Sequence, residues 1–206
     1  MIVHDCAQGT PEWMALRCGR PTASEFSRIV TSKGEESKQR IGYARTLAAE
    51  VYAGAQMADG WAGNAWTERG KEIEAEALAR YEFQNDTPIT KVGFVTLDDG
   101  VAGASPDGLV GDDGLIEVKC LKAENHVEVI LFHRRNGFVP ADYIVQTQGQ
   151  MFVTGRQWCD SVFYHPQLPL LIVRTLPNKA VTDGLVSGIP ALIKERDAIV
   201  ATLRSV

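Results

Sequence analysis

The chain has 206 residues, 45% of them hydrophobic and 23% charged, and its formal net charge at neutral pH is −5. This composition predicts one globular domain over residues 1–206 with a sizeable core, and no apolar run approaches the ~20 residues that a membrane span requires. The acidic balance argues against phosphate binding over the whole surface, so a nucleic-acid partner would need a local basic region.

The first residues, MIVHDCAQGTPEW, contain neither a basic segment nor a long apolar stretch, so no secretory signal is evident. The cysteines are scattered along the chain, without C-x-x-C pairs or histidines at zinc spacing. These residues are Cys6, Cys18, Cys120 and Cys159. We expect reduced thiols in a cytoplasmic protein, with an iron–sulfur cluster of distant cysteines as the alternative.

Two kinds of periodicity follow one another along the chain. Helical periodicity occurs in residues 36–54, 66–84, 141–155 and 188–205. Strand patterns occur in residues 90–97, 114–120, 158–165 and 169–176. Helices come first, strands gather centrally, and one helix precedes the last two strands. This order predicts an α/β fold with a mixed central β-sheet flanked by helices.

The segment SPDGLVGDDGLIEVKC, residues 105–120, predicts a hairpin that carries acidic groups. Pro106 fixes φ and the following Asp-Gly pair supplies turn chemistry, while GDDG is a second turn signal. The hairpin therefore brings Asp107 beside Glu117. Strand alternation then places Glu117 and Lys119 on one face of the sheet, although a strand with one solvated face would show the same pattern.

Carboxylates held close together repel each other, and a divalent cation removes that repulsion. Oxygen ligands suit Mg²⁺, with Mn²⁺ as a second possibility. We expect Asp107 and Glu117 to hold the metal, with the main-chain carbonyl of Val118 as a further ligand. Lys119 would orient or deprotonate the attacking water, or screen charge at the phosphate. Taken alone, this pattern also arises by chance.

Four segments together resemble the lambda exonuclease and YqaJ-like viral recombinase family. PEWMALRCGRPTASEFSRIV matches its W-x₃-R-x-G-x-x-T-A-S segment, and RGKEIEAEAL its G-x-x-x-E helix. GASPDGLVGDDGLIEVKC matches its catalytic hairpin, and YIVQTQGQMFVTG its Y-x-x-Q-x-Q-x-x-M helix. The matches occur in family order. The resemblance implies a restriction-endonuclease-like core and Mg²⁺-dependent 5′ to 3′ digestion of duplex DNA.

The resemblance also implies residue roles at the active site. Asp107, Glu117 and Lys119 fall on the catalytic positions, and Glu74 falls on that of a helical glutamate near the metals. Glu74 has an alternative interpretation as part of a solvated helix face, because other glutamates lie close to it in sequence. Gln146 falls on an active-site position, where an amide would support binding rather than acid–base chemistry.

Three further residues fall on positions that the family uses to hold the 5′-terminal phosphate: Arg17, Ser24 and Ser105. An arginine fork binds phosphate through two hydrogen bonds, and a serine at a helix start adds a hydroxyl. For Ser24 the alternative is a helix-capping segment, in which Thr22 is the cap and Glu25 completes a capping box. For Ser105 the alternative is a role in shaping the turn.

The sequence gives less specific signals for the residues that contact the substrate. The basic cluster at residues 131–137 either contacts the DNA backbone or complements the end of a helix. Trp61 and Trp66 precede the Glu74 helix, where tryptophans ordinarily cover the core. Trp66 would alternatively stack on or wedge against a terminal base pair.

The resemblance implies a processive exonuclease of phage or prophage origin that generates 3′ single-stranded tails for homologous recombination. It further implies a trimeric toroid acting on double-stranded DNA ends, beside a single-strand annealing protein, in the bacterial cytoplasm and without a membrane. A metal-dependent endonuclease or junction resolvase on the same fold is one alternative. A non-catalytic DNA-binding module is another.

Overall fold

The computed structural model describes residues 1–57 and 65–206, apart from the side chains of residues 65–69 and 71. The elements run in chain order as β1 (Ile2–His4), α1 (Pro11–Arg17), the 3₁₀ helix η1 (Ala23–Arg28), α2 (Arg40–Ala53), α3 (Ala65–Asn85), β2 (Ile89–Thr90), β3 (Phe94–Thr96), β4 (Gly103–Ala104), β5 (Gly108–Val110), β6 (Gly114–Cys120), α4 (Ala123–Asn136), α5 (Ala141–Thr154), β7 (Trp158–Tyr164), β8 (Leu171–Thr175) and α6 (Lys179–Leu203).

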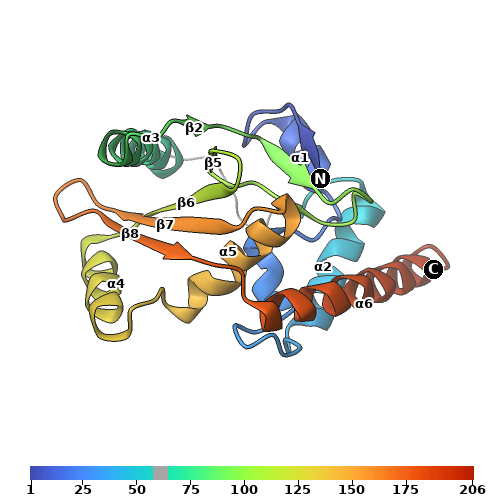
Figure 1. Cartoon of the computed structure of the whole chain (residues 1–206). Coiled ribbons are helices and arrows are strands. Elements are labelled where there is room, and N and C mark those ends of the chain that lie inside the picture. The colour runs from blue at the N-terminus through green and yellow to red at the C-terminus, as the bar shows by residue number, and fades with distance from the viewer. Residues whose placement is uncertain (58–64) are drawn as a thin grey trace.

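A five-stranded sheet in the order β2-β5-β6-β7-β8 organises the molecule. Strands β6 and β7 are parallel, and the other neighbours are antiparallel. Figure 1 shows α3 on one side of this sheet, and α4 and α5 on the other. The predicted mixed central sheet flanked by helices is therefore confirmed.

Alternating side chains of the central strands form a core on each face of the sheet. Ile116 and Val162 pack on the α3 side, where they meet Tyr81. Leu115 and Cys159 point the other way and pack against Met151 of α5. Both faces of β6 are buried, which is the usual situation for a strand with a parallel neighbour and explains its apolar row.

A further core joins α5 to the helices that lie away from this sheet. It is formed by buried side chains of η1, α2, α5 and α6, and it also contacts β3 and β4 of the small antiparallel sheet β1-β3-β4. Phe26 of η1 lies against Gly149 of α5, where a Cβ atom would come within 2.4 Å of the ring. This close approach fixes the position of α5 relative to the N-terminal segments.

Helix α6 begins nine residues before the predicted start at residue 188. Asn178 caps it by accepting hydrogen bonds from the N–H groups of Ala180 and Val181, at 2.9 and 3.4 Å. Within α6, a Cβ at Gly184 would lie 2.5 Å from the carbonyl oxygen of Gly34, and a Cβ at Gly188 would lie 2.7 Å from the Ile29 side chain. These glycines permit close packing. Neither α6 nor any other helix within residues 1–57 and 65–206 is long and apolar enough to cross a membrane.

The single strand predicted over residues 90–97 is wrong. This segment divides between β2 of the large sheet and β3 of the small sheet. Gly93 lies at the division, and a Cβ there would fall 1.7 Å from the carbonyl oxygen of Cys6. The chain thus changes sheet where the N-terminal segment passes closest to it.

A buried ionic cluster fastens α3 and β8 to the centre of the sheet. Asp160 of β7 is 2% exposed. It accepts a hydrogen bond from the Tyr81 hydroxyl at 2.7 Å and two from Arg174 at 2.8 Å. The Arg174 guanidinium also stacks 3.6 Å from the ring centre of Trp158. Burial, and then the bond to Asp160, raise the pKa of Tyr81, which therefore remains a donor.

We predict that Asp160→Asn lowers the free energy of unfolding by about 1–3 kcal/mol, because three hydrogen bonds lose a charged acceptor inside the protein. Urea denaturation followed by circular dichroism measures the change. Asp183→Asn is the matched control: it makes the same substitution in an exposed pair with Lys179 and should change stability by less than about 0.5 kcal/mol. Equal effects of the two substitutions would contradict a structural role for the Asp160 cluster.

Candidate active site

The predicted hairpin forms from β5 and β6. Gly108 lies opposite Ile116, and the main-chain N–H of Asp107 donates to the carbonyl of Ile116 at 3.2 Å. A Cβ at Gly108 would collide with Ile89 of β2 at 2.1 Å, so only glycine allows β2 to pair here. Asp107 therefore stands at the first position before β5, beside the middle of β6.

The alternation predicted for β6 is confirmed. Ile116 and Val118 face α3, whereas Glu117 contacts α5 on the opposite face. The charged side chains in this apolar row are thus directed to one side, where α5 supplies polar groups. Glu117 is 5% exposed, so its carboxylate depends on protein donors.

Three side chains donate hydrogen bonds to the Glu117 carboxylate. Lys119 and Gln146 contact Oε1 at 2.7 and 2.5 Å. Gln150 contacts Oε2 at 2.6 Å. Sequence analysis missed Gln150, although a signal was present: Gln146 and Gln150 are four residues apart and so share one helix face.

Asp107 binds the open edge of β6. Its Oδ2 accepts the Val118 N–H at 2.6 Å, and no other hydrogen bond to this carboxylate occurs among the described residues. In a strand, the N–H and carbonyl of one residue point to the same edge. The Val118 carbonyl therefore points toward Asp107, beyond the end of β5, which is the orientation that its predicted ligand role requires.

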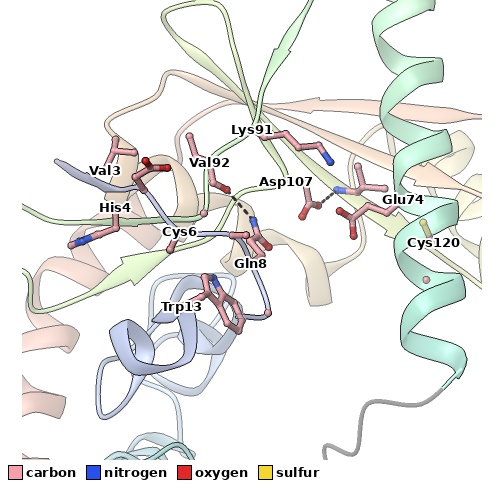
Figure 2. Close-up of a pocket in the computed structure, with 16 residues that line it drawn as sticks. Val3, His4, Cys6, Gln8, Trp13, Glu74, Lys91, Val92, Asp107 and Cys120 are labelled. Atoms are coloured by element: carbon pink, nitrogen blue, oxygen red, sulfur yellow. Dashed lines mark hydrogen bonds between the residues drawn. The ribbon is translucent and has the colours of Figure 1, made fainter. Parts of the chain in front are cut away.

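A pocket of about 940 Å³ opens in front of Asp107. Its walls are the segments 3–9 and 91–93, with Trp13, Glu74 and Val118. Figure 2 shows the carboxylates of Glu74 and Asp107 pointing toward one another in this pocket. The helical glutamate is thus brought to the hairpin from α3, where it lines the pocket beside Asp107.

Electrostatics make this cluster unfavourable in the absence of a cation. Burial, and then the charges of Glu117 and Glu74, raise the pKa of Asp107 well above its ordinary value, although the Val118 N–H acts in the opposite direction. For Lys119, burial lowers the pKa, but the charge of Glu117 and its hydrogen bond outweigh that effect and raise it. Lys119 thus remains an ammonium group, which also donates to Gln146 at 3.0 Å.

The oxygen ligands at the pocket suit a hard cation. Mg²⁺ is usually held by one or two carboxylates together with water and phosphate oxygens, and Asp107, Glu74 and the Val118 carbonyl offer oxygen ligands only. Among the side chains that the structure describes, no three of His, Cys, Asp or Glu already converge as a ligand set. The absence of a converged set is consistent with the orientation of the Glu117 carboxylate, which faces α5.

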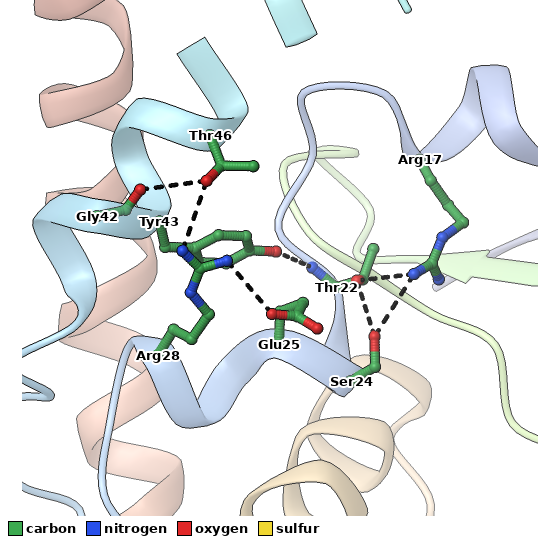
Figure 3. A network of polar contacts seen from close by, with 8 residues as sticks. All are labelled: Arg17, Thr22, Ser24, Glu25, Arg28, Gly42, Tyr43 and Thr46. Atoms are coloured by element: carbon green, nitrogen blue, oxygen red, sulfur yellow. Dashed lines mark hydrogen bonds and ion pairs between the residues drawn. The ribbon is translucent and has the colours of Figure 1, made fainter. Parts of the chain in front are cut away.

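A second polar cluster gathers Arg17 and Ser24 (Figure 3). Arg17 Nη2 donates to the hydroxyl of Thr22 at 3.3 Å and to that of Ser24 at 3.5 Å. The capping-box alternative is wrong: Thr22 directly precedes η1, but its side chain caps no N–H group. Glu25 pairs instead with Arg28, at 3.4 Å.

Trp13 connects this cluster to Ser105. Its indole N–H donates to the Ser105 hydroxyl at 2.8 Å, and its ring lies 4.3 Å below the Arg17 guanidinium. Arg17 Nε is buried and has no hydrogen-bond partner in the described part of the chain, and burial lowers the pKa of Arg17. The structure thus joins the three predicted phosphate residues, and Trp13, at position one of W-x₃-R, was the signal that sequence analysis left unused.

Of the two predicted substrate-handling features, the structure describes the side chains of only one. Trp66 lies in α3, but its side chain is outside the described residues, as is the whole of Trp61. The basic residues His133, Arg134 and Arg135 end α4 and do not line the pocket at Asp107.

Comparisons with known proteins agree with this geometry. Alkaline exonuclease LHK-Exo from Laribacter hongkongensis is 35% identical, with a TM-score of 0.81 over 95% of this chain and 97% of that chain. A structure described as LHK-Exo in complex with dAMP matches equally well. A phage-related exonuclease from Haemophilus somnus 129PT, at 16% identity and a TM-score of 0.67, covers 89% of this chain and 96% of its own, and shows likeness of fold alone.

No curated protein matches the chain. The likeness to LHK-Exo and the mixed sheet identify a restriction-endonuclease-like fold. A model of the YqaJ-like viral recombinase domain matches residues 12–157, which is more than half of the chain. The chain therefore belongs to the YqaJ-like viral recombinase domain family.

Proposed function

We propose that the protein is a metal-dependent exonuclease that digests double-stranded DNA from its 5′ end and leaves 3′ single-stranded tails for phage-type recombination. The observation that carries the proposal is the position of Asp107 beside β6, where it accepts the Val118 N–H and where the charges of Glu117 and Lys119 act on it. Family membership and the likeness to an alkaline exonuclease support the same activity.

Mg²⁺ is the proposed cofactor, with Mn²⁺ as a substitute. Asp107, Glu74 and the Val118 carbonyl would hold it on the pocket side, with Glu117 as the further carboxylate. When bound, the ion supplies Lewis-acid polarisation of the phosphate and a water that is nucleophilic at neutral pH. The raised pKa of Asp107 supports this assignment, because a cation would offset the repulsion among the carboxylates.

Lys119 is proposed to stabilise negative charge that develops on the scissile phosphate and to orient the attacking water. Its raised pKa supports these roles over proton abstraction, since the amine keeps its proton. Gln146 would fix the direction of the ammonium group, because it accepts from Lys119 and also donates to Glu117.

Arg17, Ser24 and Ser105 are proposed to hold the 5′-terminal phosphate. The buried, unpartnered Nε of Arg17 supports this role, because a guanidinium fork offers paired donors to phosphate oxygens. The LHK-Exo complex contains dAMP, a deoxynucleoside monophosphate, which is the class of product that an exonuclease releases.

A homotrimeric ring is proposed to keep the enzyme on its substrate. A chain of net charge −5 has little non-specific attraction for DNA, whereas a closed ring retains the strand by enclosure. A phage-type recombination enzyme acts where the phage DNA is, so we place it in the bacterial cytoplasm, beside a single-strand annealing protein.

The proposed activity is tested with linear, nicked and closed circular duplexes. With Mg²⁺, we expect mononucleotides from linear DNA alone, and digestion that persists after excess competitor DNA is added. Ca²⁺ should allow DNA binding but block turnover, because its ligands are longer and more numerous. Cutting of closed circles would instead support an endonuclease, and the absence of any product with Mg²⁺ or Mn²⁺ a DNA-binding module.

Asp107→Asn should lower digestion by at least ~100-fold, as expected for loss of a charged group at the reacting phosphate, and should abolish stabilisation by Mg²⁺. In EDTA it should make the protein more stable at neutral pH. The folded-state pKa of Asp107 is raised, so its contribution to stability is present below the unfolded pKa and is lost as pH rises through the folded one. Thermal unfolding across pH, with and without Mg²⁺, measures both effects.

Asp112→Asn is the control for this substitution, because Asp112 is an exposed residue in the turn of the same hairpin. It should change neither digestion nor the pH dependence of stability. A near-parental rate for Asp107→Asn, or an unfolding temperature in EDTA no higher than that of the parent, would remove Asp107 from the proposed role.

Arg17→Ala should slow digestion of 5′-phosphorylated duplexes far more than of 5′-hydroxyl duplexes. Loss of one charge-assisted hydrogen bond corresponds to ~1.5–3 kcal/mol, or about 10–100-fold in rate. Arg17→Lys should restore little, since an ammonium lacks the planar fork. Arg28→Ala is the control, because Arg28 lies on η1 but contacts Glu25 and Thr46. Equal slowing of both substrates by Arg17→Ala would indicate a structural role.

A further inference from the structure

We infer that Gln150 is a positioning residue for the metal site: it holds Oε2 of Glu117 and so fixes the direction in which this carboxylate faces. The inference rests on the proposed metal-dependent function, which it deepens by adding a residue that does not itself meet metal or DNA. The observation that carries the inference is that the two carboxylate oxygens of Glu117 have different hydrogen-bond donors.

The two oxygens of Glu117 have different partners. Oε1 accepts from Lys119 and Gln146, both of which are partly exposed. Oε2 accepts only from Gln150 among the described residues, at 2.6 Å. Gln150 is 1% exposed and Glu117 5%. The hydrogen bond from Gln150 to Oε2 is therefore buried, and water cannot replace this donor if it is lost.

A neutral amide is a suitable hydrogen-bond partner for a carboxylate that binds a metal. An ionised carboxylate only accepts hydrogen bonds, so the Gln150 atom that faces it is the NH₂ group. A lysine or arginine at this place would hold Glu117 equally well, but it would add a second positive charge to that of Lys119, which already pairs with this carboxylate. A neutral donor fixes the geometry and adds no further charge that would compete with the metal.

Stability alone does not explain a glutamine here. Gln150 Oε1 is buried without a hydrogen-bond partner among the described residues, and so is the hydroxyl of Ser161, which lies opposite Glu117 in the β6–β7 register. Burying an unsatisfied acceptor destabilises a protein, and methionine would fill this volume without such an acceptor of its own, although Oε2 of Glu117 would then lose its donor. The hydrogen bond from Gln150 to Glu117 therefore accounts for a glutamine at this position.

The backbone of α5 gives this side chain little freedom. Gln146 and Gln150 are one turn apart and grip the two oxygens of one carboxylate. Gly149 between them packs against Phe26 of η1, so α5 cannot shift to compensate for a shorter or apolar side chain. Loss of the Gln150 amide should release Oε2 while leaving the helix in place.

The test compares Gln150→Met with the parent by Mn²⁺ titration calorimetry and by DNA digestion. Loss of a group that orients a ligand typically weakens metal affinity about 10–100-fold, and we expect a loss in this range. The kcat for linear DNA should fall and recover partly at high Mg²⁺, with an unchanged KM for DNA. In EDTA the unfolding temperature should also fall, because the buried Oε2 of Glu117 loses its donor, so the Mn²⁺ affinity is the measurement that decides.

Gln148→Met is the matched control on the same helix. Gln148 is 2% exposed, and its amide is fully used: it donates to the carbonyl of Leu176 and accepts from the N–H of Asn178. This variant should unfold at a lower temperature and keep parental Mn²⁺ affinity. The two glutamines thus separate an effect on the metal site from an effect on stability.

Gln150→Met that loses stability but keeps parental Mn²⁺ affinity would overturn the inference. Should it fail to fold, Gln150→Asn replaces it, since the same amide one methylene shorter cannot reach Oε2 and should show the same loss of affinity. If neither variant folds, Gln150 is a structural residue and the inference is rejected. A parent protein that binds no Mn²⁺ would instead contradict the proposed function itself.

Discussion

The constraint on which the site depends is the burial of the Glu117 carboxylate in the middle of an apolar sheet. A charge that is 5% exposed must be hydrogen-bonded on both oxygens, and only α5 offers donors for both. Helix α5 is in turn held by contact of Gly149 with Phe26 of η1. Because η1 carries Ser24 and follows Arg17, the same packing sets the distance between the acidic cluster and the candidate phosphate cluster.

Strand β6 divides the acidic site into two environments. On one face, Glu117 is gripped by amides and by the Lys119 ammonium, so its position is determined by the protein. At the other side, Asp107 and Glu74 face an open pocket, and Asp107 accepts a single main-chain hydrogen bond. One carboxylate is therefore preorganised, while Asp107 has only one main-chain donor within the described part of the chain and faces the pocket. This division suits an enzyme that must bind a cation and a phosphate together.

Sequence reasoning succeeded where short-range rules determine the structure. Period-two alternation placed Glu117 on the correct face of β6, and two turn signals brought Asp107 beside it. It failed where tertiary contacts override local preference: α6 begins nine residues before the predicted start, and Gly184 lies inside this helix, packed against Gly34. The spacing of four residues put Gln150 on the helix face of Gln146, but its role could not be assigned until the carboxylate opposite it was known.

Unsatisfied buried polar atoms gather around these two clusters. In the described part of the chain there are five such side-chain atoms, and three of them belong to Arg17, Gln150 and Ser161, whereas the other two are histidine Nδ1 atoms. A fold selected for stability alone would pair or remove them, since each unpaired atom costs free energy. Their position beside the candidate phosphate and metal ligands therefore indicates groups kept for ligands that arrive from outside, or for holding the residues that bind those ligands. The raised pKa of Asp107 follows the same logic, because its charge is unfavourable until a cation is present.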